Sequence, residues 1–384
     1  MPGFTSMDDF VQKVTVNNQF WRTDWNKLFN PTTAAAQGEW HFMTRGAGNP
    51  GADALFNTGT NLLFQPVSDV TANAASIQHG GNVSPMYKNI INASAVSASA
   101  TTMPAVLMLV DLVGFYRLTS VTTTSAQSTT NTLAAFSTFT VGTNDIVTHT
   151  NINMMPLTRI QVSTTVTLPT GLAAATDYFV IKLTDTTFKL ASSYANAVAG
   201  TAISITAGTG SGTHTINTLL PRYTNGNGLM PLMWNTNATA LGAATPNLSI
   251  GYTNSAKTAS RATPAVLPVG KTAASNTLIL YSGTGAGKYG PFMPLQAGDS
   301  GVEKVDTITC ATSYVSGEFS VGLVKPLLVL PLTTIGVAAE RDLMNQIPSL
   351  PRIYDGAALY WVIYSTALTP ANSSFFGHMD FAWG

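Results

Sequence analysis

Short stretches in which hydrophobic and polar residues alternate recur along most of this chain of 384 residues. Alternation with a period of two is typical of strands that bury one face. Turn-forming Gly, Pro, Asn and Asp residues separate these stretches. The alternation is clearest at 136–141, 160–166 and 178–183, and further strand candidates lie at 248–252, 277–281, 305–309, 319–324 and 358–364. The pattern therefore predicts a mainly β protein.

One run departs from this alternation. Residues 103–116 (MPAVLMLVDLVGFY) are almost continuously apolar, which fits either a strand buried on both faces or a buried helix. Asp111 is the unusual residue in this run, because a buried carboxylate needs a hydrogen-bonding or cationic partner. We expect a structural role for Asp111, with a functional role as the alternative.

Residues 1–30 are the main helix candidate. Ser6 is a suitable N-cap, and Asp8 and Asp9 follow in the first turn, where the helix dipole favours carboxylates. Residues 15–18 are poor helix formers that can divide the segment, and Asn30-Pro31 ends it. Apolar residues recur at helical spacing, at Phe10, Val14, Trp21, Trp25 and Leu28. We expect a short N-terminal helical arm over 1–30.

Residues 118–218 differ in character from their flanks. Residues 119–132 are almost only Thr, Ser, Asn and Ala, which is typical of a linker or a weakly specified strand. Short strand patterns follow at close intervals, with turn signals at 142–145, 169–171 and 208–212. Strands spaced by about 8–12 residues indicate a small β-sandwich or barrel.

A short motif occurs twice in the chain, at 220–226 (LPRYTNG) and at 350–356 (LPRIYDG). Each copy places an Arg after a Pro and a turn shortly afterwards. We interpret the two copies as similar turns that lead into strands, with a duplicated half-domain as the alternative. Residues 337–346 (VAAERDLMNQ) between them predict a short helix that Pro348 ends.

The charge content narrows the function classes. Charged residues make up 9% of the chain, against about 25% in average soluble proteins, and 18 Lys and Arg balance 18 Asp and Glu. A nucleic-acid-binding surface needs an excess of cations, so we expect no direct nucleic-acid partner. A neutral protein has little charge repulsion to keep its copies apart, which favours a place in an assembly.

The chain carries a single cysteine, Cys310, so an internal disulfide is impossible. Its start, MPGFTSMDDF, lacks the basic residues and the apolar run of a signal peptide. The most apolar stretches, 103–115 and 323–337, are interrupted and shorter than the roughly 20 apolar residues of a membrane helix. We therefore expect a soluble protein that does not span a membrane.

Two segments look like catalytic motifs. Residues 278–288 (LILYSGTGAGK) resemble a strand leading into a phosphate loop, but Ser282 stands where the first Gly is needed and Tyr289 where Ser or Thr is needed. Residues 298–301 (GDSG) match the nucleophile loop of chymotrypsin-like proteases, but no histidine lies in that family's motif. We interpret the first as a Gly-rich hairpin loop and the second as a turn before a strand.

Metal and cofactor sites are not indicated by the sequence. The five histidines are scattered singly at 41, 79, 149, 214 and 378, without the spacing of a zinc site. Paired carboxylates for glycan cleavage can meet from distant positions, but no local pattern singles out a pair. We expect no catalytic, cofactor-binding or metal-binding residues and no enzymatic activity.

Aromatic residues gather near both ends of the chain. Phe20, Trp21, Trp25 and Phe29 lie within ten residues of each other, and 375–384 (FFGHMDFAWG) is also rich in aromatics. Terminal segments fray unless they dock onto something. We expect the four N-terminal aromatics to pack in the chain's own core or, as the hypothesis to test, to anchor it to a neighbouring subunit.

Residues 167–181 (TLPTGLAAATDYFVI), 187–191 (TFKLA) and 207–216 (AGTGSGTHTI) together resemble a small β-sandwich module that is common in virion proteins of tailed phages. On either side, 108–116 (MLVDLVGFY) and 220–228 (LPRYTNGNG) look like one segment split by an insertion. These flanks and three later segments are similar to a phage structural protein often encoded near the major capsid gene; the segments are 291–302, 322–327 and 348–356.

The resemblance implies a domain organisation that the strand pattern also allows. We expect an N-terminal helical arm over 1–30 and a discontinuous β-sandwich or barrel host domain over 31–117 plus 219–384. A small Ig-like β-sandwich over 118–218 is inserted between the two parts. Such insertions are tolerated where the two ends of a surface loop lie close together.

The resemblance further implies a non-enzymatic structural protein of the phage head, a cement or decoration protein, made in the host bacterial cytoplasm. Its expected partners are the major capsid protein, neighbouring virion proteins and further copies of itself, with a trimer favoured. The alternative is a tail, baseplate or fibre component whose insert, 118–218, contacts host glycans. A tailspike glycan hydrolase and the major shell protein itself are less favoured, because no carboxylate pair and no long spine helix stand out.

Overall fold

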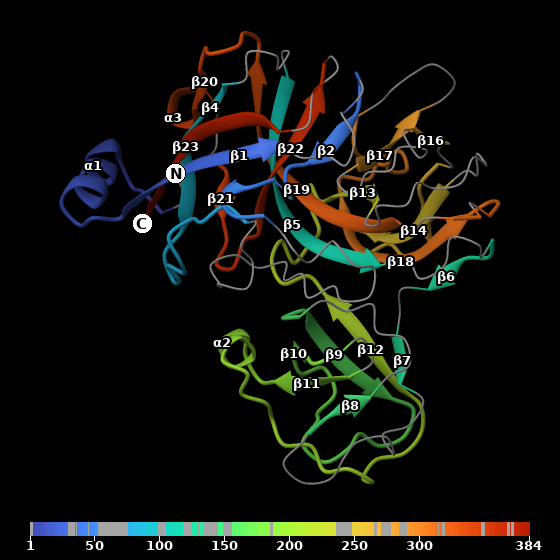
Figure 1. Ribbon diagram of the computed structural model, residues 1–384. Helices are drawn as coiled ribbons and strands as arrows, with labels where there is room; N and C mark the ends of the chain where they lie inside the picture. Colours follow the sequence, from blue (N-terminus) through green and yellow to red (C-terminus); the bar gives the residue numbers. More distant parts are fainter. Residues whose placement is uncertain are drawn as a thin grey trace.

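The structure is a computed structural model, and it describes residues 3–29, 35, 37–44, 46–52, 76–98, 105–117, 124–128, 131–133, 145–148, 156–184, 187–235, 248–264, 267–269, 278–283, 290–313, 315–316, 319–346, 350–366, 369 and 372–384. Antiparallel strands dominate this part of the chain, and its helices are short (Figure 1). The predicted mainly β fold is confirmed. The predicted strand at 136–141 lies outside the described residues.

The centre of the host domain is a seven-stranded sheet. Its order is β13 (Met230–Asn235), β19 (Phe319–Leu332), β5 (Ala105–Arg117), β22 (Leu359–Ser365), β2 (Trp40–Phe42), β17 (Leu278–Gly283) and β16 (Leu267–Val269). Because β17 pairs with β13 as well as with β2, the sheet curls back on itself into a small barrel. One cluster of buried side chains from β2, β5, β13, β17, β19 and β22 includes Phe42, Val110, Trp234, Val324 and Tyr360.

A second sheet covers one side of this barrel. Its order is β20 (Ala339–Asp342), β4 (Lys88–Ser97), β23 (Ser373–Trp383), β1 (Phe20–Phe29) and β3 (Gly48–Asn49), with β21 (Arg352–Ile353) also paired to β4. We call it the β1 sheet. Its inner face shares a core with β5, β19 and β22, in which the rings of Trp25 and Trp361 lie 5.1 Å apart.

A third sheet packs against another part of the barrel. Its order is β15 (Arg261–Ala262), β14 (Leu248–Asn254), β18 (Val302–Cys310) and β6 (Gln127–Ser128), and we call it the β14 sheet. Buried residues such as Ile250, Tyr252 and Val305 belong to one core cluster with Leu323 of β19. The barrel therefore lies between two sheets, which explains the apolar run at 103–116: β5 buries both of its faces.

The insert has a core of its own. Its strands follow the order β7 (Asn131–Leu133), β12 (His214–Leu219), β9 (Arg159–Thr164), β10 (Tyr178–Lys182), β11 (Thr187–Ala191) and β8 (Val147–Thr148). Phe188 and Val180 lie at the centre of one buried cluster, and the short helix α2 (Tyr194–Val198) packs on the opposite face. In Figure 1 this unit lies below the host domain. β6 pairs with β18, so Gln127–Ser128 belong to the host's β14 sheet and the insert's sheet begins at Asn131.

The helix predicted over 1–30 is wrong beyond residue 15. Helix α1 spans Met7–Thr15, Asn18 takes a left-handed backbone conformation (φ 54°), and residues 20–29 form strand β1. Every residue of β1 pairs with β23. Trp21, Trp25 and Phe29 are spaced by four, and a spacing of four places side chains on one face of either a helix or a strand. The pattern was therefore ambiguous, and pairing with a distant strand decided it.

The short helix predicted at 337–346 is also only partly correct. Residues 339–342 form β20, which pairs with β4, and helix α3 is confined to Leu343–Gln346. No helix among the described residues is long and apolar enough to cross a lipid bilayer.

Candidate functional site

The four aromatic residues predicted as an anchor divide into two pairs. Trp25 and Phe29 are buried in the core between the β1 sheet and the barrel, and the ring of Phe29 lies 5.3 Å from that of His41. Phe20 is half-buried and Trp21 is exposed, at the opposite end of β1. Only Phe20 and Trp21 therefore have surface left for a neighbour.

Trp21 is held in place by a glycine loop. A Cβ atom on Gly80 would lie 2.7 Å from Cγ of the Trp21 ring, and Gly80 has a φ of +79°. The buried ammonium of Lys88 fixes this loop, because it donates hydrogen bonds to the carbonyls of His79 and Gly81. Trp21 is nevertheless 43% exposed. The loop thus orients an aromatic ring that remains open to solvent.

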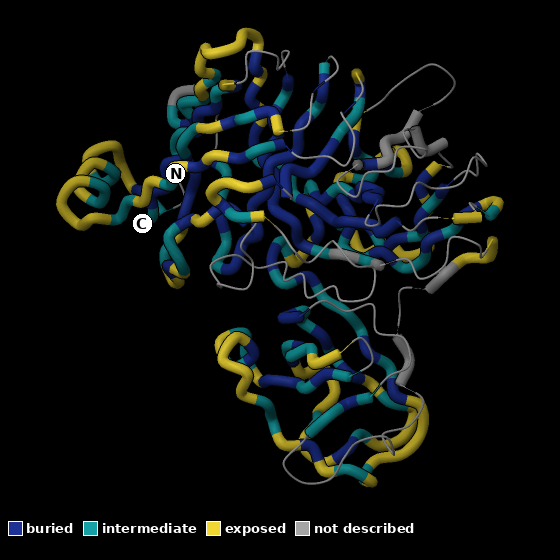
Figure 2. Tube along the Cα trace, in the orientation of Figure 1, coloured by how far each residue is buried: buried dark blue, intermediate teal, exposed yellow. Residues whose placement is uncertain are grey.

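Helix α1 projects from the body beside the N-terminal end of β1 (Figure 1). The helix is largely exposed to solvent (Figure 2). The Ser6 hydroxyl accepts a hydrogen bond from the Asp9 N–H, and the Asp9 carboxylate accepts one from the Thr5 N–H, which lowers the pKa of Asp9. No α1 residue is buried, and Met7 and Val11 are 54% and 49% exposed. Four residues apart, they form an apolar stripe. We call this helix with Trp21 the arm surface.

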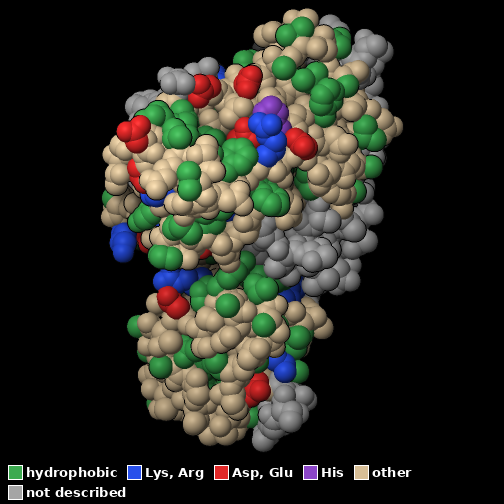
Figure 3. Space-filling model, turned by 90° about the vertical axis from the view of Figure 1, so that its left-hand side faces the viewer, with side chains coloured by type: hydrophobic (Ala, Val, Ile, Leu, Met, Phe, Trp, Pro, Cys, Tyr) green, Lys and Arg blue, Asp and Glu red, His purple; other side chains and the backbone are tan. Residues whose placement is uncertain are grey.

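The outer face of the β1 sheet carries a group of charges. Arg22 forms a two-pronged ion pair with Asp380 at 2.7 and 2.8 Å, and this pairing raises the pKa of Arg22. His378 lies between them and Ser94, and Glu340 accepts a hydrogen bond from Asn92. Figure 3, which views the molecule from this side, shows acidic, basic and histidine side chains gathered at one place on a mostly uncharged surface.

Ser94, His378 and Asp380 are the residue types of a hydrolase triad, but their geometry does not fit one. Ser94 Oγ lies 2.8 Å from His378 Nδ1, whereas His378 Nε2 and Asp380 Oδ2 are 3.9 Å apart, too far for a hydrogen bond. Asp380 is engaged by Arg22 instead, and Ser94 Oγ accepts a bond from the His378 N–H. A base oriented by a carboxylate is missing here.

The GDSG segment is a structural turn before β18, as the sequence indicated. The Asp299 carboxylate accepts hydrogen bonds from Arg261, Tyr252 and Asn254. The hydrogen bonds from Arg261 and Tyr252 lower the pKa of Asp299 to about 2. Ser300 Oγ shares a hydrogen bond with Ser255 at 2.9 Å. Asp299 therefore ties β14, β15 and the turn together and is not available to orient a histidine.

Asp111 has the cationic partner that its position demands. The guanidinium of Arg222 donates to both carboxylate oxygens and to the Leu112 carbonyl, and both side chains are almost fully buried. Asp111 also accepts from the Ala358 N–H. Burial alone would lower the pKa of Arg222, but the charge of Asp111 raises it. The structural role expected for Asp111 fits this geometry.

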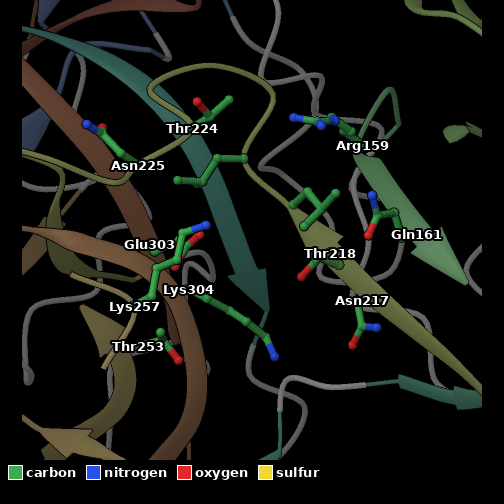
Figure 4. A pocket seen from close by; sticks show the side chains of 12 residues that line it. Arg159, Gln161, Asn217, Thr218, Thr224, Asn225, Thr253, Lys257, Glu303 and Lys304 are labelled. Atoms are coloured by element: carbon green, nitrogen blue, oxygen red, sulfur yellow. The ribbon is translucent and has the colours of Figure 1, made fainter. Parts of the chain in front are cut away.

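A polar cleft of about 600 Å³ lies between the insert and the host domain. Figure 4 shows Arg159, Gln161, Asn217 and Thr218 of the insert on one side and host side chains on the other. Arg159 and Gln161 both bond to Asp177; burial alone would raise the pKa of that carboxyl, but these hydrogen bonds lower it. The host wall consists of Thr224, Asn225, Thr253, Lys257, Glu303 and Lys304. Amides, hydroxyls and a few charges are the groups that bind polyhydroxylated ligands.

Neither a metal nor a reactive thiol is indicated in the described part of the chain. No three His, Cys, Asp or Glu residues there lie close enough to hold a metal ion. Cys310 is buried in the β14 sheet, and burial raises its pKa to about 11, so the thiolate form is disfavoured. The Gly-rich segment 284–288 lies outside the described residues.

No protein-family model and no curated protein matches this chain. The charged group on the β1 sheet and the interdomain cleft were both missed by sequence reasoning. Their residues come from strands far apart in the sequence, so no local spacing could reveal them. The period of two along β1 and β23 places Arg22 and Asp380 opposite the core face, but this signal is usable only once β1 is known to be a strand.

Proposed function

We propose that this protein is a non-enzymatic structural component of a tailed-phage virion, a cement or decoration protein that binds the assembled head. The similarity of residues 160–216 and their flanks to phage virion proteins supports the proposal. So does the low charge, because such a surface can form broad interfaces through hydroxyls and amides with little electrostatic repulsion.

The observation that carries the proposal is the arm surface. Met7 and Val11 expose apolar side chains on a helix that stands away from the body (Figure 1), and Trp21, the second residue of β1, is also exposed. Exposed apolar and aromatic groups of this kind are typical of protein contacts, in which tryptophan is enriched. We infer that the arm surface docks onto a neighbouring subunit, either the major capsid protein or a further copy of this chain.

The mechanism that we propose is mass action. A protein that binds the assembled shell but not its separated subunits stabilises the shell by the free energy of binding. Many identical weak contacts on a closed shell then resist dissociation together. No chemical step is required of the protein.

The first experiment is the copy number per particle, measured by quantitative mass spectrometry against the major shell protein. Hundreds of copies in a simple ratio to that protein are the expected result. Absence from purified particles would overturn the proposal, and a few dozen copies or fewer would move the protein to the tail or a vertex.

The arm surface is tested with the double variant Met7→Ser/Val11→Ser and with Trp21→Ala. We expect each to lower the copy number, because each removes exposed apolar surface without disturbing the core. The matched control is Val166→Ser, which removes a 67% exposed side chain from the insert and should incorporate normally. Normal incorporation of both arm variants would exclude the arm surface as the contact.

The interdomain cleft favours a second candidate function. A tail, baseplate or fibre component could hold a host glycan between the insert and the host domain, where hydroxyl and amide groups face each other (Figure 4). Saturable binding of host-cell polysaccharide that is lost in Asn217→Ala, combined with a low copy number, would favour this candidate over the first.

A further inference from the structure

The two copies of the repeated motif meet in the folded chain. Leu220–Gly226 precedes β13, and Leu350–Gly356 leads into β22; the first residues of these two strands lie at the level of Asp111 and Leu112 in the middle of β5. The rings of Tyr223 and Tyr354 contact each other edge to face, with 4.6 Å between their centroids. The interpretation as two similar turns that lead into strands fits this arrangement.

The arginines of the two motifs have different partners. Arg222 binds the carboxylate of Asp111 with two parallel hydrogen bonds, the geometry that suits a planar guanidinium best. Arg352 occupies the corresponding place after the proline of the second motif. Its guanidinium has no carboxylate or carbonyl partner among the described residues, and its Nε is buried without a hydrogen bond.

Arg352 is nevertheless held firmly. Its guanidinium carbon lies 4.0 Å from the centre of the Tyr87 ring and 4.2 Å from that of Tyr354. The backbone of Arg352 is also paired to Asn89 in strand β4. Contact with two aromatic rings stabilises the cation and leaves the N–H groups in its plane open for an acceptor.

A pocket of about 260 Å³ lies at this arginine. Its walls are formed by Ser84–Tyr87, by Pro221 and Arg222, and by Arg352–Asp355. The charge of Arg222 is already balanced by Asp111. Asp355 is the carboxylate that the described residues contribute to the wall, and it accepts hydrogen bonds from the N–H groups of Val83 and Ser84 at 2.9 and 3.2 Å. Those two bonds stabilise the Asp355 carboxylate in its place, and Arg352 is the cation without a carboxylate partner in the described part of the wall.

We propose that this pocket binds a carboxylate through Arg352, as the first motif binds Asp111 through Arg222. The volume suits a single acidic side chain. We assign that side chain to a neighbouring subunit in the particle, and this assignment rests on the proposed function. A small free carboxylic acid would present the same carboxylate to the pocket.

The first test uses the isolated full-length protein and sodium acetate as the probe, with sodium chloride at equal ionic strength as the reference. The Nε–H resonance of Arg352, assigned by its loss in Arg352→Lys, is followed by ¹⁵N NMR. We expect a saturable shift with acetate and none with chloride. Equal responses to both salts would overturn the proposal.

Variants separate binding from folding. Arg352→Gln should weaken acetate binding by about tenfold or more, because a charge-assisted pair of hydrogen bonds is lost. Tyr87→Phe keeps the aromatic face and should bind as the wild type does. Arg341→Gln removes an arginine of β20 outside the pocket and is the matched control. An Arg352→Gln variant that unfolds like the wild type and still binds acetate equally would contradict the proposal.

Incorporation into purified particles shows whether a neighbouring subunit or a free acid supplies the carboxylate. If a neighbouring subunit supplies it, Arg352→Gln lowers the copy number per particle while Arg341→Gln does not, and added acetate competes with incorporation. Normal incorporation of Arg352→Gln would overturn the assignment to a subunit. If the wild-type protein is absent from particles, the proposed function fails, whereas the acetate titration still decides the chemistry of the pocket.

Discussion

Asp111 and Arg222 show how one buried charge constrains a fold of low charge content. Asp111 lies in the middle of β5 and binds both Arg222, which follows the insert, and the backbone of Ala358, which precedes β22. Three segments far apart in the sequence are thereby held together beside the middle of β5. The ion pair fixes the relative positions of these segments but adds little net stability. The cost of removing both charges from water offsets much of the attraction between them.

Removing one partner of this pair should be severe. We expect Arg222→Met to lower the free energy of unfolding by about 3–5 kcal/mol, because Asp111 is left buried without its cation. Urea unfolding followed by tryptophan fluorescence measures the change. Lys304→Met is the matched control: its ion pair with Asp306 is partly exposed, so the expected loss is less than about 1 kcal/mol. Equal losses in the two variants would contradict the assignment.

The low pKa of Asp299 predicts that the free energy of unfolding falls in acid. Its pKa is about 2 in the folded protein against an ordinary value of 3.8, so the folded state binds this proton less readily than the unfolded state does. The stabilisation is present in full above about pH 4 and is lost as the pH falls toward 2. Asp299→Asn should therefore flatten the dependence of the urea midpoint on pH in that window.

The control for this pH series is Ser300→Ala, which changes the neighbouring residue without removing a titrating group. It should keep the acid dependence of the wild type. If Asp299→Asn keeps that dependence as well, Asp299 does not carry the effect.

At the scale of elements, the host domain and the insert have separate cores. The buried cluster around Phe188 and Val180 shares no residue with the three clusters of the host. The two parts are joined through the segments around β6 and β12, and Gln127–Ser128 still pairs with the host strand β18. Separate cores favour separate unfolding transitions.

Tryptophan fluorescence can test this separation, because all six tryptophans (21, 25, 40, 234, 361 and 383) lie outside the insert. Phe188→Ala should destabilise the insert by about 3–5 kcal/mol and leave the fluorescence transition unchanged. Phe42→Ala, the same change in the barrel, should shift that transition. A joint shift of fluorescence and of the insert's methyl NMR signals in Phe188→Ala would show one cooperative unit.

The elements also show where sequence patterns were sufficient. Alternation located strands such as β9, β10, β14 and β18, because each of them buries one face. The same rule could not decide β5 or β1. β5 is buried on both faces, and the aromatic residues of β1 recur at a spacing that a helix and a strand share.

At the scale of the whole molecule, the barrel is buried between two sheets and most polar groups face outward. Among the buried polar residues, Lys27 and Lys88 bind backbone carbonyls of neighbouring loops. What remains for a partner is a surface with few charges, one charged group on the β1 sheet and the arm surface (Figures 2 and 3).

The proposed function predicts a concentration-dependent effect on particles. Purified protein added to particles that lack it should raise their dissociation temperature, and above the dissociation constant the rise should continue with the logarithm of the free protein concentration, even after the sites are filled. Differential scanning calorimetry of the particles measures the shift. The Met7→Ser/Val11→Ser variant should require a higher concentration for the same rise. A dissociation temperature that is independent of added protein would exclude a cement role.

The sequence by itself determined the mainly β class, the turn at Asp299, and the need of Asp111 for a partner. These follow from local rules: the period of side-chain burial, turn chemistry, and the cost of burying a lone charge. Tertiary structure alone decided which strands pair, that β1 is a strand, that Arg222 is the partner of Asp111, and that Arg352 lies beside an open pocket. Contacts between residues 100 to 350 positions apart leave no periodic trace in the chain, because packing selects them only after the sheets have formed.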